Sequence, residues 1–184
     1  DQRFLFNNPN YTDGTQYHVQ WRIVDTGVPG YDEVIETSFG NTGTVGAVNF
    51  VGSSEPVPSI AALTMGEFSF DIRMVSNPND VELLFKVDAV DPETLFGTST
   101  GEQPLGDLPV VGPNGPWTRF TCPIATLEAQ GLDTSKITAP FVLVPGNRGA
   151  GQGVIVQRDN VTFSPVASGG ATPLALPLTF DTLP

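Results

Sequence analysis

Apolar and polar residues alternate along several short stretches of this chain, which is the pattern of a β-strand with one buried and one wet face. The clearest example is EFSFDIRMV (67–75), where large apolar side chains fall on one parity and charged or small polar side chains on the other. The stretches HVQWRIV (18–24) and VELLFKVDAV (81–90) alternate in the same way. The pattern therefore predicts strands that share one core.

Further strand-like runs are separated by loops rich in Gly and Pro, of which the chain has 20 and 17. These runs cover residues 3–6, 32–39, 46–51, 117–124, 137–145 and 154–163. Loops are expected at 25–31 and, over a longer span, at 91–116; the only expected helix is ATLEAQG (125–131). Because eight or nine strands with apolar faces need mutual cover, we predict an all-β fold. It should be a two-sheet β-sandwich of jelly-roll topology with at most one short helix.

The last clear strand, VIVQRDNVTFSP (154–165), changes the parity of its apolar residues halfway along. Val154 and Val156 fall on one side of an extended chain, whereas Val161 and Phe163 fall on the other. A change of this kind predicts a β-bulge at the intervening Arg-Asp-Asn. Asp and Asn suit a bulge because their side chains can bond to nearby backbone groups.

Composition sets the domain boundary. We expect residues 1–165 to form the β-sandwich domain, because the tail PVASGGATPLALP (165–177) has the composition of a linker. The tail runs into LPLTFDTLP, which looks like the start of another strand. We therefore predict that residues 166–184 are a linker and the start of a following module, or else an extra edge strand of this domain.

The charge balance excludes several classes of partner. The chain has twenty carboxylates against eight Lys and Arg, a net charge of −12. This balance argues against nucleic acid and against anionic membrane surfaces, which both attract basic proteins. No apolar run approaches membrane-spanning length. The lone Cys122 cannot form an internal disulfide, and the single His18 leaves little for transition-metal binding or general-base catalysis.

Four stretches, taken together and in this order, resemble a known family. They are HVQWRIVDTGVPGYDEVIE, GEFSFDIRMVSNPNDVELLFKVDA, GPWTRFTCPIATLEAQGLDTSKITAPFVLVP and GVIVQRDNVTF, and they cover most of residues 18–163. The FDIR strand, the W-x-x-F strand, the L-D-x-S-K-I turn and the closing DNV are similar to galactose-binding-like jelly rolls on polysaccharide-degrading enzymes of marine bacteria. The nearest resemblance is to the C-terminal domain of ExoP-type exo-β-glucanases. The LPLTFD ending resembles the openings of further modules in such enzymes.

This resemblance implies a non-catalytic carbohydrate-binding module, secreted as part of a larger enzyme, with a catalytic domain attached in the parent chain. We expect a monomer that binds an algal polysaccharide. A β-glucan such as laminarin is favoured, and agar-type or anionic glycans are the alternatives.

The resemblance also implies a structural calcium ion near the closing Asp-Asn strand, at Asp159, although Arg158 stands where the family usually has an apolar residue. Calcium takes six to eight oxygen ligands. The segment from Asp25 to Asp32 offers two carboxylates and several free carbonyls, so these two residues are the other candidate ligands. The alternative is that all three Asp side chains only form Asx-turns.

Aromatic side chains are the first candidates for sugar binding, because their faces pack against sugar C–H groups. Trp117 follows Gly-Pro and shares parity with Arg119, which favours an exposed platform; a semi-buried edge position is the alternative. Tyr31, beside a loop glycine, and Tyr17, at the lip of a strand, are further candidates, with a solvated loop tyrosine as the alternative for Tyr31. Trp21 shares its parity with apolar neighbours and is expected in the core.

Five of the eight cationic side chains fall within predicted strands, mostly on the polar parity: Arg22, Arg73, Lys86, Arg119 and Arg158. Guanidinium groups can fork to sugar hydroxyls, carboxylates or sulfates. We therefore take Arg119, Arg73 and Arg22 as candidate ligand-binding residues. The alternative is cross-strand pairing with neighbouring acids, namely Glu67, Asp71, Glu82 and Asp88.

Two rival functions remain open. The domain could be a structural spacer that packs on its catalytic neighbour, with Trp117 and the arginines buried at that contact. It could also be a small jelly-roll lyase or glycanase, for which Tyr17 beside His18 is the only adjacent pair of suitable side chains. The sequence has no G-x-S-x-G nucleophile motif and no Gly-rich phosphate loop that opens a helix.

Overall fold

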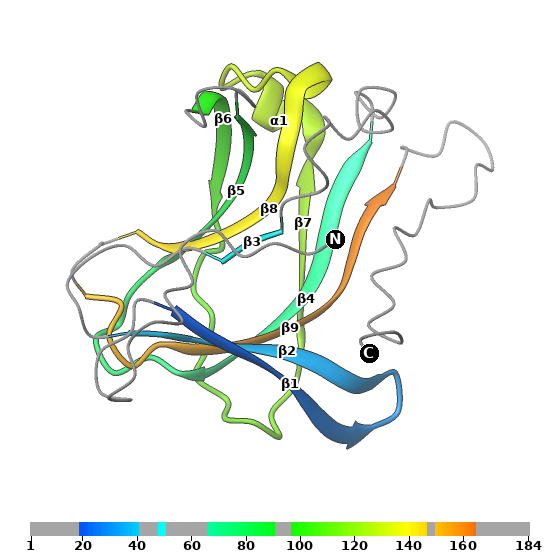
Figure 1. The fold of residues 1–184 in the computed structure, drawn as a ribbon. Helices are drawn as coiled ribbons and strands as arrows, with labels where there is room; N and C mark the ends of the chain where they lie inside the picture. Colours follow the sequence, from blue (N-terminus) through cyan, green and yellow to red (C-terminus); the bar gives the residue numbers. More distant parts are fainter. Residues whose placement is uncertain (1–18, 41–47, 51–65, 91–96, 147–149, 165–184) are drawn as a thin grey trace.

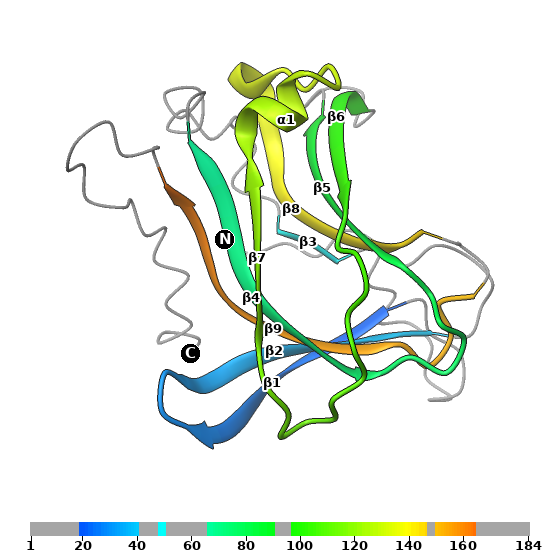
Figure 2. The ribbon, with the colours of Figure 1, turned by 180° about the vertical axis from the view of Figure 1, so that it is seen from behind.

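A computed structural model describes residues 19–40, 48–50, 66–90, 97–146 and 150–164. Within these ranges the chain forms nine β-strands in two sheets, one short α-helix and one 3-10 turn (Figures 1 and 2). The predicted all-β sandwich is confirmed. Tyr17, His18, the predicted strand at 3–6 and the tail 166–184 lie outside the described residues, so the predicted domain boundary stays a prediction.

The larger sheet has the strand order β1-β2-β9-β4-β7, and every neighbouring pair is antiparallel. Its strands are β1 (Val19–Val28), β2 (Tyr31–Phe39), β9 (Ile155–Ser164), β4 (Glu67–Ser76) and β7 (Thr118–Pro123). The smaller sheet has the order β3-β8-β5-β6, also antiparallel. Its strands are β3 (Val48–Phe50), β8 (Ile137–Pro145), β5 (Leu83–Val90) and β6 (Gly97–Pro104).

The core lies between the two sheets and follows the predicted parity. Phe68, Phe70, Ile72 and Met74 of β4 are all buried, at 2% exposure or less. Aromatic rings cross the interface, as where Phe68 stacks on Phe85 of β5 with centroids 4.4 Å apart. Burial of such large apolar surfaces is the main favourable term in folding.

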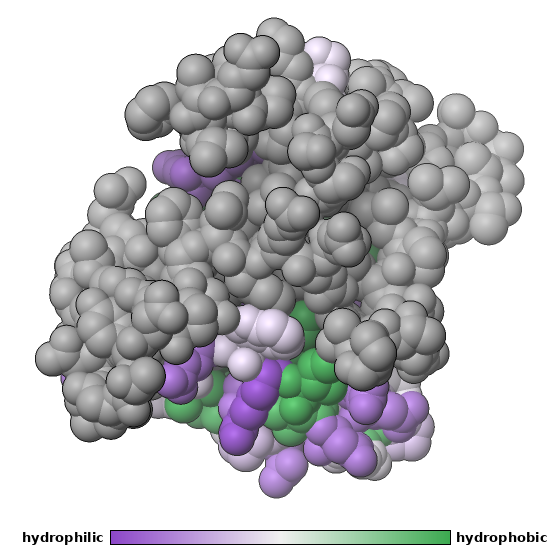
Figure 3. All heavy atoms as spheres, viewed as in Figure 1, coloured by the Kyte–Doolittle hydropathy of each residue, from purple (hydrophilic) through white to green (hydrophobic). Residues whose placement is uncertain are grey.

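Strand β1 forms one edge of the larger sheet. Trp21 is half-buried and packs against the core, as its parity predicted. Figure 3 shows apolar side chains among polar ones over β1 and β2, where this part of the surface is described. The expected loop at 25–31 is wrong, because β1 continues to Val28 and the turn is only Pro29–Gly30. Positive φ angles at Gly27 (61°) and Gly30 (84°) allow this tight hairpin.

The prediction of a loop throughout 91–116 is also wrong, because β6 pairs with β5 from Leu84↔Pro104 to Val90↔Gly97. This edge strand has the sequence GTSTGEQP, which shows no apolar alternation and so gave no strand signal. The helix α1 (Ile124–Glu128) packs against β6. A Cβ on Gly101 would lie 2.6 Å from Leu127 Cβ, so only glycine allows this close approach.

The predicted bulge in β9 is confirmed. Asp159 lies opposite Asp71 and Thr162 lies opposite Ser69, so β9 has one more residue than β4 in this interval. Asn160 has a φ of 50°, a left-handed conformation that Asn tolerates better than most residues. The extra residue reverses the parity of the strand.

Arg158 lies just before this bulge and its side chain is directed into the core, not onto the polar face that its charge suggested. It is 1% exposed, its guanidinium carbon lies 5.2 Å from the centroid of the Phe141 ring, and its Nη1 donates to Thr37 at 2.6 Å. Burial lowers the pKa of Arg158 to about 9. Strand β9 therefore places a buried cation between the two sheets.

Candidate functional site

Polar side chains from every strand of the larger sheet meet on the face turned away from the smaller sheet. They alternate with core residues along the same strands. We call this surface the outer face, and its principal polar residues are Arg22, Glu36, Ser69, Asp71, Arg73, Arg119 and Gln157.

One row of this face crosses four strands. Arg22, Glu36, Gln157 and Arg73 lie directly opposite one another on β1, β2, β9 and β4. Arg22 Nη2 lies 2.6 Å from Glu36 Oε1, and Gln157 Nε2 donates to Glu36 Oε2 at 2.8 Å. Arg73 Nε in turn donates to Gln157 Oε1 at 2.6 Å. Only Arg22 is well exposed, with 73% of its side chain accessible, so most of the row is a buried polar layer.

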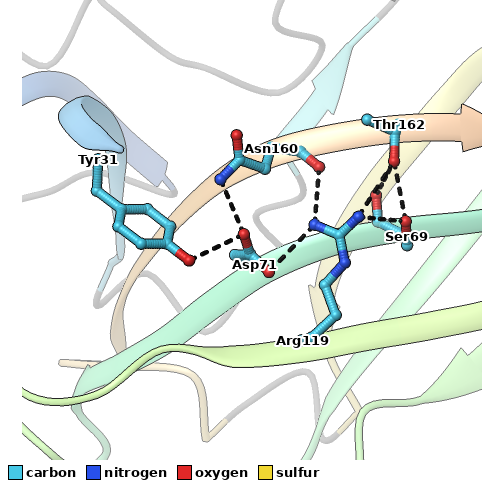
Figure 4. A network of polar contacts seen from close by, with 6 residues as sticks. All are labelled: Tyr31, Ser69, Asp71, Arg119, Asn160 and Thr162. Carbon is cyan, nitrogen blue, oxygen red and sulfur yellow. Dashed lines mark hydrogen bonds and ion pairs between the residues drawn. The ribbon is translucent and has the colours of Figure 1, made fainter. Parts of the chain in front are cut away.

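Asp71 is the centre of a second group of contacts (Figure 4). Its Oδ2 accepts from Tyr31 Oη at 3.1 Å and from Asn160 Nδ2 at 2.8 Å, and its Oδ1 pairs with Arg119 Nη1 at 3.1 Å. Asp71 is 7% exposed. Because both of its oxygens are engaged, this carboxylate serves to position three other side chains.

Arg119 is held by a fork of contacts but remains accessible. Its Nη2 donates to Ser69 Oγ at 2.7 Å and to Thr162 Oγ1 at 3.3 Å, and its Nη1 also donates to the Asn160 carbonyl at 3.3 Å (Figure 4). Its side chain is still 46% exposed. A planar cation fixed in this way presents donors in a defined direction.

Trp117 and Tyr31 form an aromatic pair at the edge of this group. Their ring centroids are 4.4 Å apart and the ring planes differ by 10°. The guanidinium carbon of Arg73 lies 4.4 Å from the Trp117 ring centroid. Both aromatic residues are half-buried. Trp117 is thus a semi-buried edge residue packed against two neighbours.

Burial and these contacts shift the pKa values of Tyr31 and Arg73. Burial raises the pKa of the Tyr31 phenol, and the hydrogen bond to Asp71 and the charges of Asp71 and Asp159 raise it further. Burial lowers the pKa of Arg73, while the charge of Glu36 opposes that change. Tyr31 is therefore a neutral hydrogen-bond donor to Asp71 at ordinary pH.

The segment between β6 and β7 places Trp117. Figure 2 shows it descending from β6 to the lower end of the molecule and returning as β7. Before β7 begins, Val110 forms a bridge with Met74 of β4, and Val111 N donates to the Met74 carbonyl at 2.9 Å. The Gly115 carbonyl then accepts from Arg73 Nη1 at 3.1 Å. A Cβ on Gly115 would lie 2.3 Å from Val111 Cβ, so this turn requires glycine.

The structure brings together four of the predicted ligand-binding residues: Trp117, Arg119, Arg73 and Tyr31. Arg22 lies at the far end of the row, and Tyr17 lies outside the described residues. Sequence reasoning missed Glu36, Gln157 and Asn160, and it considered Asp71 only as an ion-pair partner. The sequence did contain a signal for Asp71, because Asp71 and Ser69 share the parity of Arg73 on β4.

The described residues offer no ready calcium site. Asp25 Oδ1 accepts from Gly27 N at 2.9 Å, which is an Asx-turn, and Asp32 is exposed. Burial raises the pKa of Asp159, a hydrogen bond from the Asn160 backbone lowers it, and the charge of Asp71 raises it. Over the described ranges, no three His, Cys, Asp or Glu side chains are grouped to hold a metal ion. This arrangement does not fit the expected ligand set, and calcium stays a prediction.

A hollow of about 520 Å³ lies beside the end of β4 and the start of β5, with Asp80, Glu82 and Asp107 in its wall. The residues that line it include no aromatic side chain, so it lacks a platform for a sugar ring. No helix in the described ranges is long and apolar enough to span a bilayer.

Sequence comparison finds neither a protein-family model nor a curated protein that matches this chain. Structure comparison does find a shared fold. A family 11 carbohydrate-binding module from Clostridium thermocellum, solved with a β-1,3-1,4-mixed-linked tetrasaccharide, has a TM-score of 0.54 at 16% identity, covering 78% of this chain and 80% of that chain. A family 30 carbohydrate-binding module has a TM-score of 0.62 at 12% identity, covering 86% and 83%.

An exo-β-agarase has a TM-score of 0.59 at 17% identity, covering 91% of this chain but 25% of that chain. The likeness to these structures establishes the fold. The chain is a jelly-roll β-sandwich of the kind found in carbohydrate-binding modules, as the sequence predicted.

Proposed function

We propose that this domain is a non-catalytic carbohydrate-binding module that binds a neutral polysaccharide, a β-glucan such as laminarin, on its outer face. The observation that carries the proposal is the Tyr31–Trp117 aromatic pair next to the fixed, half-exposed fork of Arg119. Aromatic faces against sugar C–H groups, with planar polar groups at the hydroxyls, are the usual means of holding a neutral sugar.

The charge of the face supports a neutral ligand. Arg22 is paired with Glu36 and Arg119 with Asp71, and Arg73 is linked to Glu36 through Gln157. An anionic glycan would have to displace these carboxylates from their arginines and approach a protein of net charge −12. Agar-type chains, which also carry neutral sugars, remain the nearest alternative ligand.

The parent protein is proposed to be a secreted polysaccharide-degrading enzyme, with this module monomeric and joined to a catalytic domain. The match to the exo-β-agarase supports a modular setting, since the shared fold covers only a quarter of that longer chain. In such an arrangement, binding raises the local concentration of the attached catalytic domain at the polymer.

A structural spacer is the second candidate, and one observation favours it. Glu36, Gln157, Asp71 and Ser69 are buried and bonded mainly to one another and to arginines, so few polar groups remain for a ligand. A glycanase site on the outer face is disfavoured because the carboxylates of Asp71 and Glu36 are fully occupied by donors, whereas a glycosidase needs two available carboxyl groups.

Isothermal titration calorimetry separates the first two candidates. The domain is titrated with laminarin, mixed-linked β-glucan, agarose oligosaccharides and alginate. We expect heat with at least one neutral glucan, reduced in Arg119→Ala and unchanged in Lys86→Ala, which removes a cation from the smaller sheet. Absence of heat with every polymer would favour the spacer, and new reducing ends or unsaturated sugar would favour an enzyme.

A further inference from the structure

Two buried hydrogen-bond donors of the outer face have no acceptor in the part of the chain that the structure describes. Arg73 Nη2 and Trp117 Nε1 have no hydrogen-bond partner among the described residues, and each nitrogen is buried. Arg73 as a whole is 2% exposed, so its guanidinium is a desolvated cation. Leaving buried donors unsatisfied costs free energy, and proteins satisfy most such groups.

The two donors belong to one cluster. The guanidinium carbon of Arg73 lies 4.4 Å from the Trp117 ring centroid, so its unpaired nitrogen lies close to the indole. The other two nitrogens of Arg73 are fixed by Gln157 and by the Gly115 carbonyl. Because the tight glycine turn holds that carbonyl in place, Arg73 cannot turn to satisfy Nη2 without breaking an existing bond. Donors arranged in this way call for an oxygen acceptor.

Tyr31 is the neighbour that can move. Its ring covers Trp117, and its hydroxyl donates to Asp71. It lies directly after the turn of the β1–β2 hairpin, whose residues 27–30 are exposed and whose glycines adopt positive φ. Only residues 35–38 of β2 pair with β9, so residues 31–34, next to the hairpin turn, have no partner on that side. The tip of the hairpin can therefore shift without opening the core.

We propose that Arg73 and Trp117 form a covered sugar subsite, which rests on the proposed function above. Tyr31 leaves the indole when a neutral glycan binds, and a sugar ring takes its place against Trp117. Sugar oxygens accept from Trp117 Nε1 and from Arg73 Nη2, and a sugar hydroxyl replaces the Tyr31 hydroxyl as donor to Asp71 Oδ2. The ligand therefore needs an acceptor and a donor on the same ring, which hydroxyl groups supply.

An uncharged ring suits this subsite. Arg73 bonds only to neutral groups, the Gln157 amide and the Gly115 carbonyl, and the exchange at Asp71 replaces one neutral hydroxyl with another. The stacked rings leave no space between them for a sugar, since their centroids are 4.4 Å apart. Displacement of Tyr31 is the step that makes the indole face available.

The test uses NMR of the whole domain labelled with 15N at tryptophan. The two indole N–H signals are assigned with Trp21→Phe, and the protein is titrated with laminaritetraose and with a β-1,3-1,4-mixed-linked tetrasaccharide. We expect the Trp117 Nε1–H signal to move downfield as it gains an acceptor, and the ring-to-ring contacts between Tyr31 and Trp117 to disappear.

Affinity measurements by calorimetry give a second arm. Trp117→Phe keeps an aromatic ring but removes the N–H donor, and we expect it to weaken binding about tenfold. Tyr31→Ala removes the cover, and we expect it to strengthen binding because no displacement is then required. If the sugar instead stacks on Tyr31, this variant weakens binding, and the covered subsite is overturned.

Failure of this inference is distinct from failure of the proposed function. Heat of binding with no change at the Trp117 indole or at the Tyr31–Trp117 contacts overturns the subsite and leaves the module assignment standing. A water molecule that stays bonded to Trp117 Nε1–H with and without sugar also overturns it. Absence of heat and of signal changes with both tetrasaccharides and with the polymers overturns both proposals.

Discussion

Arg119 and Asp71 lie directly opposite each other on β7 and β4, and their side chains form an ion pair of 3.1 Å. Asp71 is nearly buried, whereas about half of the Arg119 side chain is accessible. An ion pair between exposed groups contributes little, but a buried carboxylate with three donors is costly to alter. The ion pair therefore joins the buried carboxylate of Asp71 to the guanidinium group of Arg119, which remains accessible to a ligand.

The first prediction concerns that anion. Asp71→Asn keeps the shape of the side chain but replaces one acceptor oxygen with a donor and removes the charge. We expect the free energy of unfolding to fall by about 1–3 kcal/mol in urea denaturation. Asp88→Asn, which weakens the 3.7 Å contact to Lys86 on the smaller sheet, should cost less than about 1 kcal/mol. Equal losses in the two variants would contradict the central role of Asp71.

The second prediction concerns the bulge of β9. Asn160→Gly and Asn160→Val both lose the 2.8 Å bond to Asp71, so their difference isolates the backbone conformation. Glycine adopts the φ of 50° freely, whereas a β-branched residue is strained there. We expect the valine variant to be less stable than the glycine variant by about 1–3 kcal/mol. Thermal unfolding of both proteins measures this, and a reversed order would rule out strain at this position.

Periodicity predicted most of the fold, because it reports which residues face the core. The parity of β4 identified the residues that face the core, although the predicted wet face of β4 is wrong because its polar residues are buried as well. The parity change in β9 located the bulge. It failed for β6, whose polar sequence forms a strand only because the edge of β5 is available for pairing. For Arg158 the periodicity was right, since Arg158 shares the parity of the buried Val156, and it was the charge of the side chain that suggested the wet face.

The candidate site was predicted less completely, for a physical reason. Parity identifies a polar face but does not say which segments cover it. Trp117 and Arg73 meet because residues 110–115 contact the end of β4 and place the Gly115 carbonyl against Arg73, a contact between distant positions in the chain. The unsatisfied donors of these two residues depend on that contact, so alternation alone does not reveal them.

The third prediction is a pH dependence of Tyr31. Its pKa is raised above the usual value of 10.0 in the folded protein. The stabilisation from its neutral form is therefore complete below pH 10 and is lost as the pH rises through the folded pKa. The difference in unfolding free energy between the parent and Tyr31→Phe should accordingly shrink at alkaline pH.

Tyrosinate absorbance measures the same group directly. The parent should show one phenol that ionises above pH 10 and that is missing from the titration of Tyr31→Phe. A Tyr31 phenol that ionises at or below pH 10 would contradict both the buried environment and the bond to Asp71.

The fourth prediction is the calcium ion expected from the sequence. If Asp159 and its neighbours bind calcium, EDTA should lower the melting temperature of the domain, because a ligand that binds only the folded state stabilises it. Asp159→Asn should then remove most of this sensitivity to EDTA. An unchanged melting midpoint after EDTA treatment would instead agree with the Asx-turn at Asp25 and the absence of a metal-binding group among the described residues.

The last prediction separates charge from geometry in the proposed binding of a neutral glucan. The ligand carries no charge, and the two exposed arginines of the outer face, Arg22 and Arg119, are paired with carboxylates in the free protein. We therefore expect affinity for laminarin to change less than about twofold between roughly 0.05 and 0.5 M NaCl, because salt screens only charged interactions. A strong loss of affinity with salt would indicate an anionic ligand.

Variants at Arg119 complete that argument. Arg119→Lys keeps the charge but loses the planar fork that contacts Ser69, Thr162 and Asp71, so it should weaken binding almost as much as Arg119→Gln. Lys86→Gln makes the same change in net charge on the smaller sheet and should have no effect. If Arg119→Lys binds like the parent, charge rather than the directed donors of the fork would be what the outer face contributes.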